Sequence, residues 1–90
     1  MQDKMRENIL DELRRKNGKR IVICQIGFIS TKFLVNCLNY QVEIDTLTIK
    51  DEEQEVYLSI NLNQVYKYDI KDNKVKLYLD NDTIIIITED

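Results

Sequence analysis

The chain has 90 residues, of which 43% are hydrophobic and 32% charged, and its formal net charge is −3. This composition is typical of one globular domain, which we expect to span residues 1–90, and it excludes a disordered or low-complexity chain. Polar side chains interrupt the most apolar stretch, residues 21–38, so the sequence predicts no transmembrane helix, no membrane partner and a cytoplasmic location.

Residues 3–17 are predicted to form a helix. Met5, Ile9 and Leu13 recur every four residues, which gives the helix one apolar stripe. Gly18 follows the last periodic residues and is expected to end the helix in the left-handed conformation.

The end of this helix carries a basic cluster within a chain whose charge is unevenly distributed. Residues 1–40 have a net charge of +4 and residues 41–90 a net charge of −7. The candidate phosphate-binding residues are Arg14, Arg15, Lys16, Lys19 and Arg20. The alternative is a solvated helix end, where the cations complement the helix dipole and Lys16 pairs with Glu12 one turn earlier.

Residues 20–88 are predicted to form an antiparallel meander of five or six strands, because short alternating segments are separated by polar turns. With the helix, this predicts an α+β, mainly β fold with a strongly bent sheet or a partly open small barrel. A turn at 30–31 pairs Phe28 with Phe33, Ile26 with Val35 and Cys24 with Cys37. Both cysteines are then expected to be buried thiols, and the alternative is a strained cross-strand disulfide or redox pair.

The middle of the chain predicts a kinked region of the sheet. Residues 42–49 are expected to form one bent strand, since the apolar alternation shifts by one residue in its middle, as at a β-bulge. A turn at 52–53 then pairs Leu47 with Leu58, and residues 63–64 are expected to break the following strand.

Turns at 72–73 and 81–82 are predicted to connect the last three strands. The expected cross-strand pairs are Tyr68 with Leu77, Ile70 with Val75, Leu77 with Ile86, and Leu79 with Ile84. One face of these strands is therefore expected to join the core.

Four consecutive isoleucines, residues 84–87, place apolar side chains on both faces of the last strand. In the expected register, the first and third isoleucines face the core. Ile85 and Ile87, together with Tyr78, then form a second apolar face that either the N-terminal helix or a second subunit must cover. We take these three residues as interface candidates.

A family resemblance rests on the order of these elements. They are the helix 3–17, a strand from Arg20, a bent strand from Phe33 to Ile49, and the strand end Ile60-Asn61-Leu62-Asn63. This order resembles that of the Sm-like (Hfq-like) small-barrel family. The resemblance implies assembly into a ring through edge strands and RNA binding in the pore, and no binding residue of the family is carried over.

The residues offer little catalytic or metal-binding chemistry. The chain contains no histidine, and two cysteines are too few for a zinc site. Glu43 and Asp45 share a predicted strand face but have no further group to complete a site, and residues 80–82 lack the glycine and glutamate of a calcium loop. We expect no enzyme activity, no metal and no cofactor.

The sequence thus predicts a small binding or assembly protein. The first hypothesis is a protein-interaction module that acts as a homo-oligomer and can also bind another protein, as an inhibitor or adaptor whose acidic face meets a basic partner. The alternatives are an Sm-like nucleic-acid-binding protein, which would use the basic cluster 14–20, and a protein that sequesters a small molecule.

Overall fold

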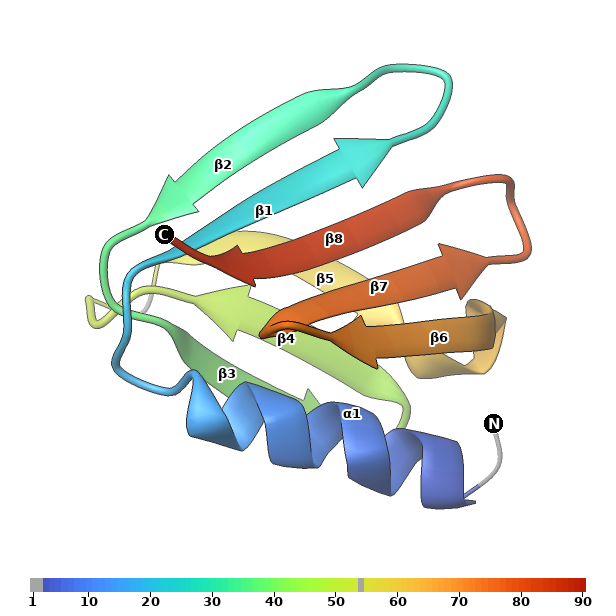
Figure 1. Ribbon diagram of the computed structural model, residues 1–90, viewed down its shortest axis with the longest axis horizontal. Coiled ribbons are helices and arrows are strands. Elements are labelled where there is room, and N and C mark those ends of the chain that lie inside the picture. Colours follow the sequence, from blue (N-terminus) through green and yellow to red (C-terminus); the bar gives the residue numbers. More distant parts are fainter. Residues whose placement is uncertain (1–2, 54) are drawn as a thin grey trace.

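Two antiparallel sheets and one N-terminal helix make up the computed structural model, which describes residues 3–53 and 55–90 (Figure 1). The elements are α1 Asp3–Arg15, β1 Ile21–Ile26, β2 Thr31–Val35, β3 Asn39–Glu43, β4 Thr46–Lys50, β5 Val56–Asn61, the 3₁₀ helix η1 Leu62–Gln64, β6 Val65–Lys71, β7 Lys74–Leu79 and β8 Ile84–Glu89. The five-stranded sheet has the order β2-β1-β8-β7-β6 and the three-stranded sheet the order β3-β4-β5. The α+β, mainly β class is confirmed. The described residues form eight strands rather than five or six, and their two sheets do not close into a barrel.

The helix α1 uses the predicted apolar stripe. Ile9 and Leu13 are fully buried, and the helix ends at Arg15, two residues earlier than expected. The next residues form a tighter turn with bonds between residues three apart, and Gly18 has the expected positive φ of 79°. Asn8 Nδ2 donates a hydrogen bond of 2.8 Å to the Tyr68 hydroxyl, which attaches the helix to the edge strand β6.

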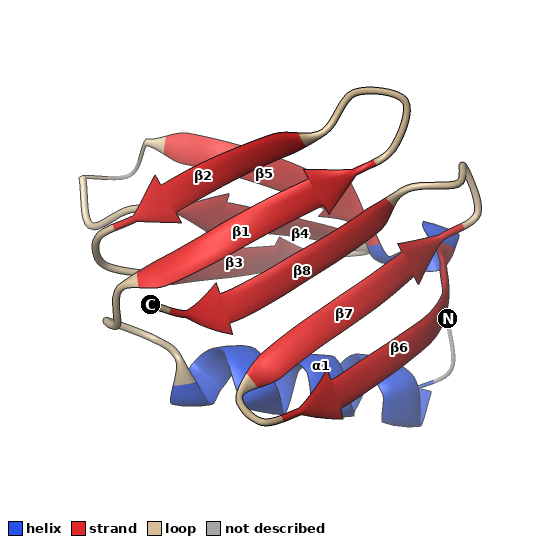
Figure 2. Ribbon diagram, turned by 45° about the horizontal axis from the view of Figure 1, so that its top comes forward, coloured by secondary structure: helices blue, strands red, loops and turns tan. Residues whose placement is uncertain are grey.

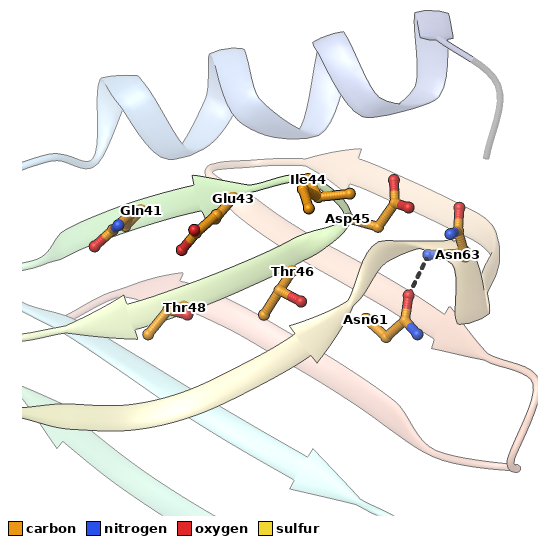
Figure 3. A pocket seen from close by; sticks show the side chains of 8 residues that line it. All are labelled: Gln41, Glu43, Ile44, Asp45, Thr46, Thr48, Asn61 and Asn63. Carbon is orange, nitrogen blue, oxygen red and sulfur yellow. Dashed lines mark hydrogen bonds between the residues drawn. The ribbon is translucent and has the colours of Figure 1, made fainter.

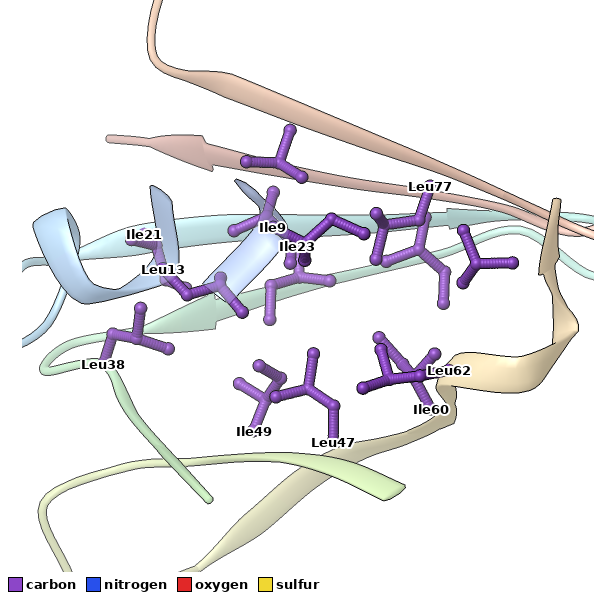
Figure 4. Close-up of a cluster of buried hydrophobic side chains, with 14 of the residues drawn as sticks. Ile9, Leu13, Ile21, Ile23, Leu38, Leu47, Ile49, Ile60, Leu62 and Leu77 are labelled. Carbon is purple, nitrogen blue, oxygen red and sulfur yellow. The ribbon is translucent and has the colours of Figure 1, made fainter. Parts of the chain in front are cut away.

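The core fills the space between the two sheets (Figure 4). Ile21, Ile23 and Leu77 come from the five-stranded sheet and meet Leu47, Ile49 and Ile60 from the three-stranded sheet, while Ile9 and Leu13 enter from the helix. All of these side chains are at most 1% exposed. Helix and sheets therefore share one core, in which each layer buries one apolar face.

The first hairpin differs from its predicted register. Ile23 pairs with Phe33, and Cys24 pairs with Lys32 instead of Cys37. The connection is longer than a two-residue turn, and Phe28 lies in it fully exposed to solvent. The prediction considered only the pairing of apolar residues within the hairpin. In the structure β1 also pairs with β8, and this pairing directs Ile21 and Ile23 toward the core.

Residues 42–49 form two strands rather than one bent strand. A two-residue turn at Ile44 and Asp45 joins β3 to β4, and Val42 pairs with Leu47. The shift in apolar alternation therefore marks a chain reversal and not a bulge.

Across the next turn, Leu47 pairs with Ile60, two residues from the expected Leu58, and a two-residue slip leaves the buried face unchanged. The predicted break after β5 is confirmed as η1.

The β6–β7 hairpin is confirmed. Asp72 and Asn73 have φ values of 52° and 64°, as a tight hairpin turn requires, and Tyr68 pairs with Leu77. The opposite-charge pair of Asp69 with Lys76 follows from the same register.

The β7–β8 register is displaced by one residue from the prediction. The turn holds three residues, 80–82, with Asp82 at φ 62°, and Leu77 pairs with Ile85. A slip of one residue exchanges the two faces of a strand. Ile85 and Ile87 are therefore 2% and 0% exposed in the core, and their assignment to a second face was wrong.

Truncation of neighbouring isoleucines will test this register. Ile85→Ala opens a cavity in the core and is expected to lower the free energy of unfolding by about 3 kcal/mol. Ile86→Ala removes a side chain on the opposite face and is expected to cost less than half as much, because that face is open to solvent. Urea unfolding of both variants measures the difference, and equal losses would contradict the register.

A second prediction concerns strain at Ile44, a β-branched residue with a φ of 56°. Glycine reaches this conformation without a steric clash, so Ile44→Gly is expected to stabilise the protein by about 1 kcal/mol in urea unfolding. Ile44→Ala keeps the Cβ atom that causes the strain and serves as the control. A stabilising effect of the same size in the alanine variant would show that strain is not the cause.

Candidate functional site

The face of the five-stranded sheet that points away from the core is open to solvent. We call it the outer face. Figure 2 shows its strands in front, with the helix and the three-stranded sheet behind them. Its apolar residues are Val22, Ile26, Leu34, Tyr78, Ile84 and Ile86. They lie in rows across the sheet, because Tyr78 is opposite Ile84, and Ile84 is opposite Ile26.

Lysines border this apolar centre. They are Lys32, Lys67, Lys71, Lys74 and Lys76. Within residues 3–53 and 55–90 none of these five lysines forms an ion pair. Two acidic side chains also lie on the described outer face: Asp69, opposite Lys76, and Asp90, which lies beside Val22 and Lys32 and pairs with Arg20. The outer face is therefore strongly positive on a chain with a net charge of −3.

Aromatic rings gather at one end of the outer face. The ring centroids of Tyr66 and Tyr78 are 6.4 Å apart, and Lys67 Nζ lies 5.0 Å from the centroid of Tyr78. This cation–π contact holds one lysine over the ring and partly covers it.

The sequence contained a signal for this face that we did not use. Lys67, Asp69 and Lys71 alternate along one strand, and Lys74 and Lys76 along the next. The correctly predicted turn at 72–73 already places them together, opposite the core. The prediction instead sought the basic surface in the first 40 residues.

The three interface candidates do not lie together. Tyr78 is on the outer face, whereas Ile85 and Ile87 are core residues and have no free surface in the folded chain. Ile84 and Ile86 take their place beside Tyr78 and are partly exposed. The helix covers the core side of the sheet and not the outer face (Figure 2).

The five phosphate candidates all form ion pairs. Arg14 contacts Asp11 at 3.4 Å, Arg15 contacts Glu12 at 2.8 Å, Lys16 contacts Glu12 at 3.1 Å, Lys19 contacts Glu89 at 2.9 Å and Arg20 contacts Asp90 at 2.9 Å. Lys16 is only 1% exposed, so its ammonium group cannot reach a phosphate. The structure thus places the cluster among carboxylates rather than on a free basic surface.

The Glu12–Lys16 pair is buried, which its sequence spacing did not indicate. Burial acts to raise the pKa of Glu12, but hydrogen bonds from Lys16 and Arg15, and their positive charges, outweigh it and lower the pKa below its usual value. Lys16 Nζ donates to Glu12 Oε1, and Arg15 Nη1 donates to the second carboxylate oxygen. The carboxylate therefore neutralises a lysine that would otherwise be unpaired inside the protein.

A polar hollow of about 530 Å³ lies over the three-stranded sheet (Figure 3). Its lining consists of Gln41, Glu43, Ile44, Asp45, Thr46, Thr48, Asn61 and Asn63. Glu43 ends β3, whereas Asp45 lies in the turn and accepts a hydrogen bond of 3.3 Å from Arg6 Nη1. The two carboxylates thus lie on different elements, and one is occupied by a structural ion pair.

Other chemistry is sparse in the described part of the chain. No three side chains of histidine, cysteine, aspartate or glutamate gather there as metal ligands.

Cys24 lies on the outer face, and Cys37 lies beyond β2 with its Sγ 3.6 Å from the Gly18 carbonyl oxygen. Both are free thiols and only partly buried, so the expectation of buried cysteines was wrong.

Comparisons of the chain with protein-family models, curated proteins and solved structures found no match. Among the described residues, no helix is long and apolar enough to cross a membrane. The functional argument therefore rests on the geometry of the outer face.

The buried ion pair generates a stability prediction. Glu12→Gln leaves the Lys16 ammonium group without its counter-charge, so we expect the free energy of unfolding to fall by about 3 kcal/mol at pH 7. Because the pKa of Glu12 is lowered on folding, the carboxylate stabilises the protein fully above its unfolded pKa of 4.5. The stabilisation disappears as the pH falls through the lower, folded-state pKa.

Chemical denaturation of the wild-type protein and the Glu12→Gln variant between pH 7 and pH 2 measures the difference in their free energies of unfolding. Arg15→Gln is the control, because the Arg15 side chain is 73% exposed and its loss should cost little. If the loss of unfolding free energy in Glu12→Gln stays constant down to the lowest pH, the negative charge of Glu12 is not what stabilises the protein.

Proposed function

We propose that this chain is a non-enzymatic binding protein that docks an acidic protein partner on its outer face. The observation that carries the proposal is an uncovered sheet face with an apolar centre, bordered by lysines that form no ion pair in the described residues. Contiguous apolar surface with a polar rim is typical of protein-interaction sites.

The two kinds of residue on the outer face have separate roles. Burial of Ile84, Ile86 and Leu34 against a partner supplies the favourable free energy of binding, because apolar surface leaves water. The surrounding lysines select a partner with complementary negative charge and accelerate its association. A partner surface with carboxylates around an apolar patch fits both features.

A protein partner is better supported than a nucleic acid, which the Sm-like resemblance implies. Single-stranded nucleic acids stack their bases on aromatic rings. Tyr66 offers one exposed ring at the end of the outer face, but the Tyr78 ring already carries Lys67, and Ile84 and Ile86 offer no ring for stacking. A small-molecule ligand has less support still, because the polar hollow is lined mainly by polar side chains, whereas small-molecule sites are mostly apolar clefts.

Photo-cross-linking from Cys24 will test the proposal. In a Cys37→Ser background, a benzophenone group attached to Cys24 sits on the outer face and is expected to form adducts with an acidic protein in an extract of the source cells. Adding Lys76→Glu to this labelled protein reverses one border charge and is expected to lower the adduct yield about tenfold.

The matched control carries the same group on Cys37 in a Cys24→Ser background, away from the outer face. Equal adducts from both positions, or a yield that Lys76→Glu leaves unchanged, would refute docking on this face. Adducts that disappear after nuclease treatment would identify a nucleic acid as the partner and would overturn the protein proposal.

A further inference from the structure

Exposed apolar side chains gather in the β1–β2 hairpin. Of the seven large hydrophobic residues that are exposed in the described chain, four belong to this hairpin. They are Ile26, Phe28, Ile29 and Leu34. Phe28 is fully exposed and Ile29 is 71% exposed, so the hairpin tip buries almost none of its apolar surface. The cost of exposing this surface suggests that another molecule covers it.

The strand β2 is also an unprotected sheet edge. It pairs with β1 in unbroken register, and no described strand pairs with its other side. Phe33 packs edge-on against Tyr57 of β5, with ring centroids 6.5 Å apart, and so closes the inner side of β2 while its backbone edge stays open. Lys32 is the one charged residue on the strand.

The opposite edge of the same sheet is protected. β6 has an irregular register between Val65 and Lys67, and the helix lies beside it with Asn8 bonded to Tyr68. Bulges and covering helices are common devices against edge-to-edge pairing. Their presence on β6 and not on β2 makes β2 the edge that is available for pairing.

We infer that a second copy of this chain pairs with β2, so that two β2 strands run antiparallel about a two-fold axis at Phe33. This register places Lys32 opposite Leu34 of the second copy, and no lysine faces another lysine. The aliphatic stem of Lys32 can then cover the leucine side chain. Pairing of the two outer faces across their surfaces would instead bring several lysines near one another, which the charge disfavours.

The inferred dimer extends the proposed docking site and does not depend on it. Two five-stranded sheets become one continuous sheet, with the apolar parts of both outer faces in the middle and the β6 and β7 lysines at the two ends. An acidic partner with two binding segments would bind such a surface more tightly than it binds one copy. The interface is small, so we expect association in the micromolar range.

Sedimentation velocity of the purified protein from about 1 to about 300 µM will test the inference. The apparent mass is expected to double over this range. Leu34→Asn is expected to keep the protein monomeric. Ile44→Asn, which removes a still more exposed aliphatic residue in the β3–β4 turn, should leave the dimer intact. A wild-type protein that stays monomeric throughout, or two variants that behave alike, would overturn it.

Disulfide trapping tests the register separately. In a Cys24→Ser, Cys37→Ser background, a mixture of the Lys32→Cys and Leu34→Cys proteins is expected to form a cross-linked dimer faster than either protein alone, because these positions face each other across the axis. Faster cross-linking of either variant with itself would contradict the inferred pairing. Neither measurement uses the acidic partner, so a protein that does not dimerise leaves the proposed docking function unaffected. In the same way, a failed search for an acidic partner leaves the inferred dimer unaffected.

Discussion

The pairing of β8 with both β1 and β7 is the constraint on which the rest of the structure depends. β8 is the central strand of the five-stranded sheet, and its four isoleucines make it apolar on both sides. Ile85 and Ile87 anchor the sheet to the core. Ile84 and Ile86 necessarily point the other way, because strand side chains alternate. Burial of one pair of isoleucines thus creates the apolar centre of the outer face.

The helix completes the core but does not cover the outer face. It lies beside β6 and contacts the β3–β4 turn through Arg6, which donates a hydrogen bond of 2.6 Å to the Ile44 carbonyl oxygen. The helix therefore connects the edges of the two sheets. Glu12 of the helix and Lys16, just beyond its end, lie in the interior as a pair. The described residues form no second α-helix that could cover the outer face.

Charge is organised by sheet face rather than by position along the chain. Four of the five lysines in residues 41–90 lie on the outer face, although this half of the sequence has a net charge of −7. The basic residues near the end of the helix are instead neutralised by nearby carboxylates, two of which, Glu89 and Asp90, come from the far end of the chain. A count of charges along the sequence hides both facts, because a strand separates neighbouring residues onto opposite faces.

Local features were determined by the sequence alone. The helix and its buried stripe, Gly18 as its stop, the break after β5 and the tight turn at Asp72-Asn73 each depend on residues close together in the chain. The register of β8, the separation of β3 from β4 and the burial of Lys16 were decided only by tertiary structure. Each depends on a distant strand or on the space between layers, and one residue more in the turn at 80–82 was enough to exchange the core and the surface isoleucines.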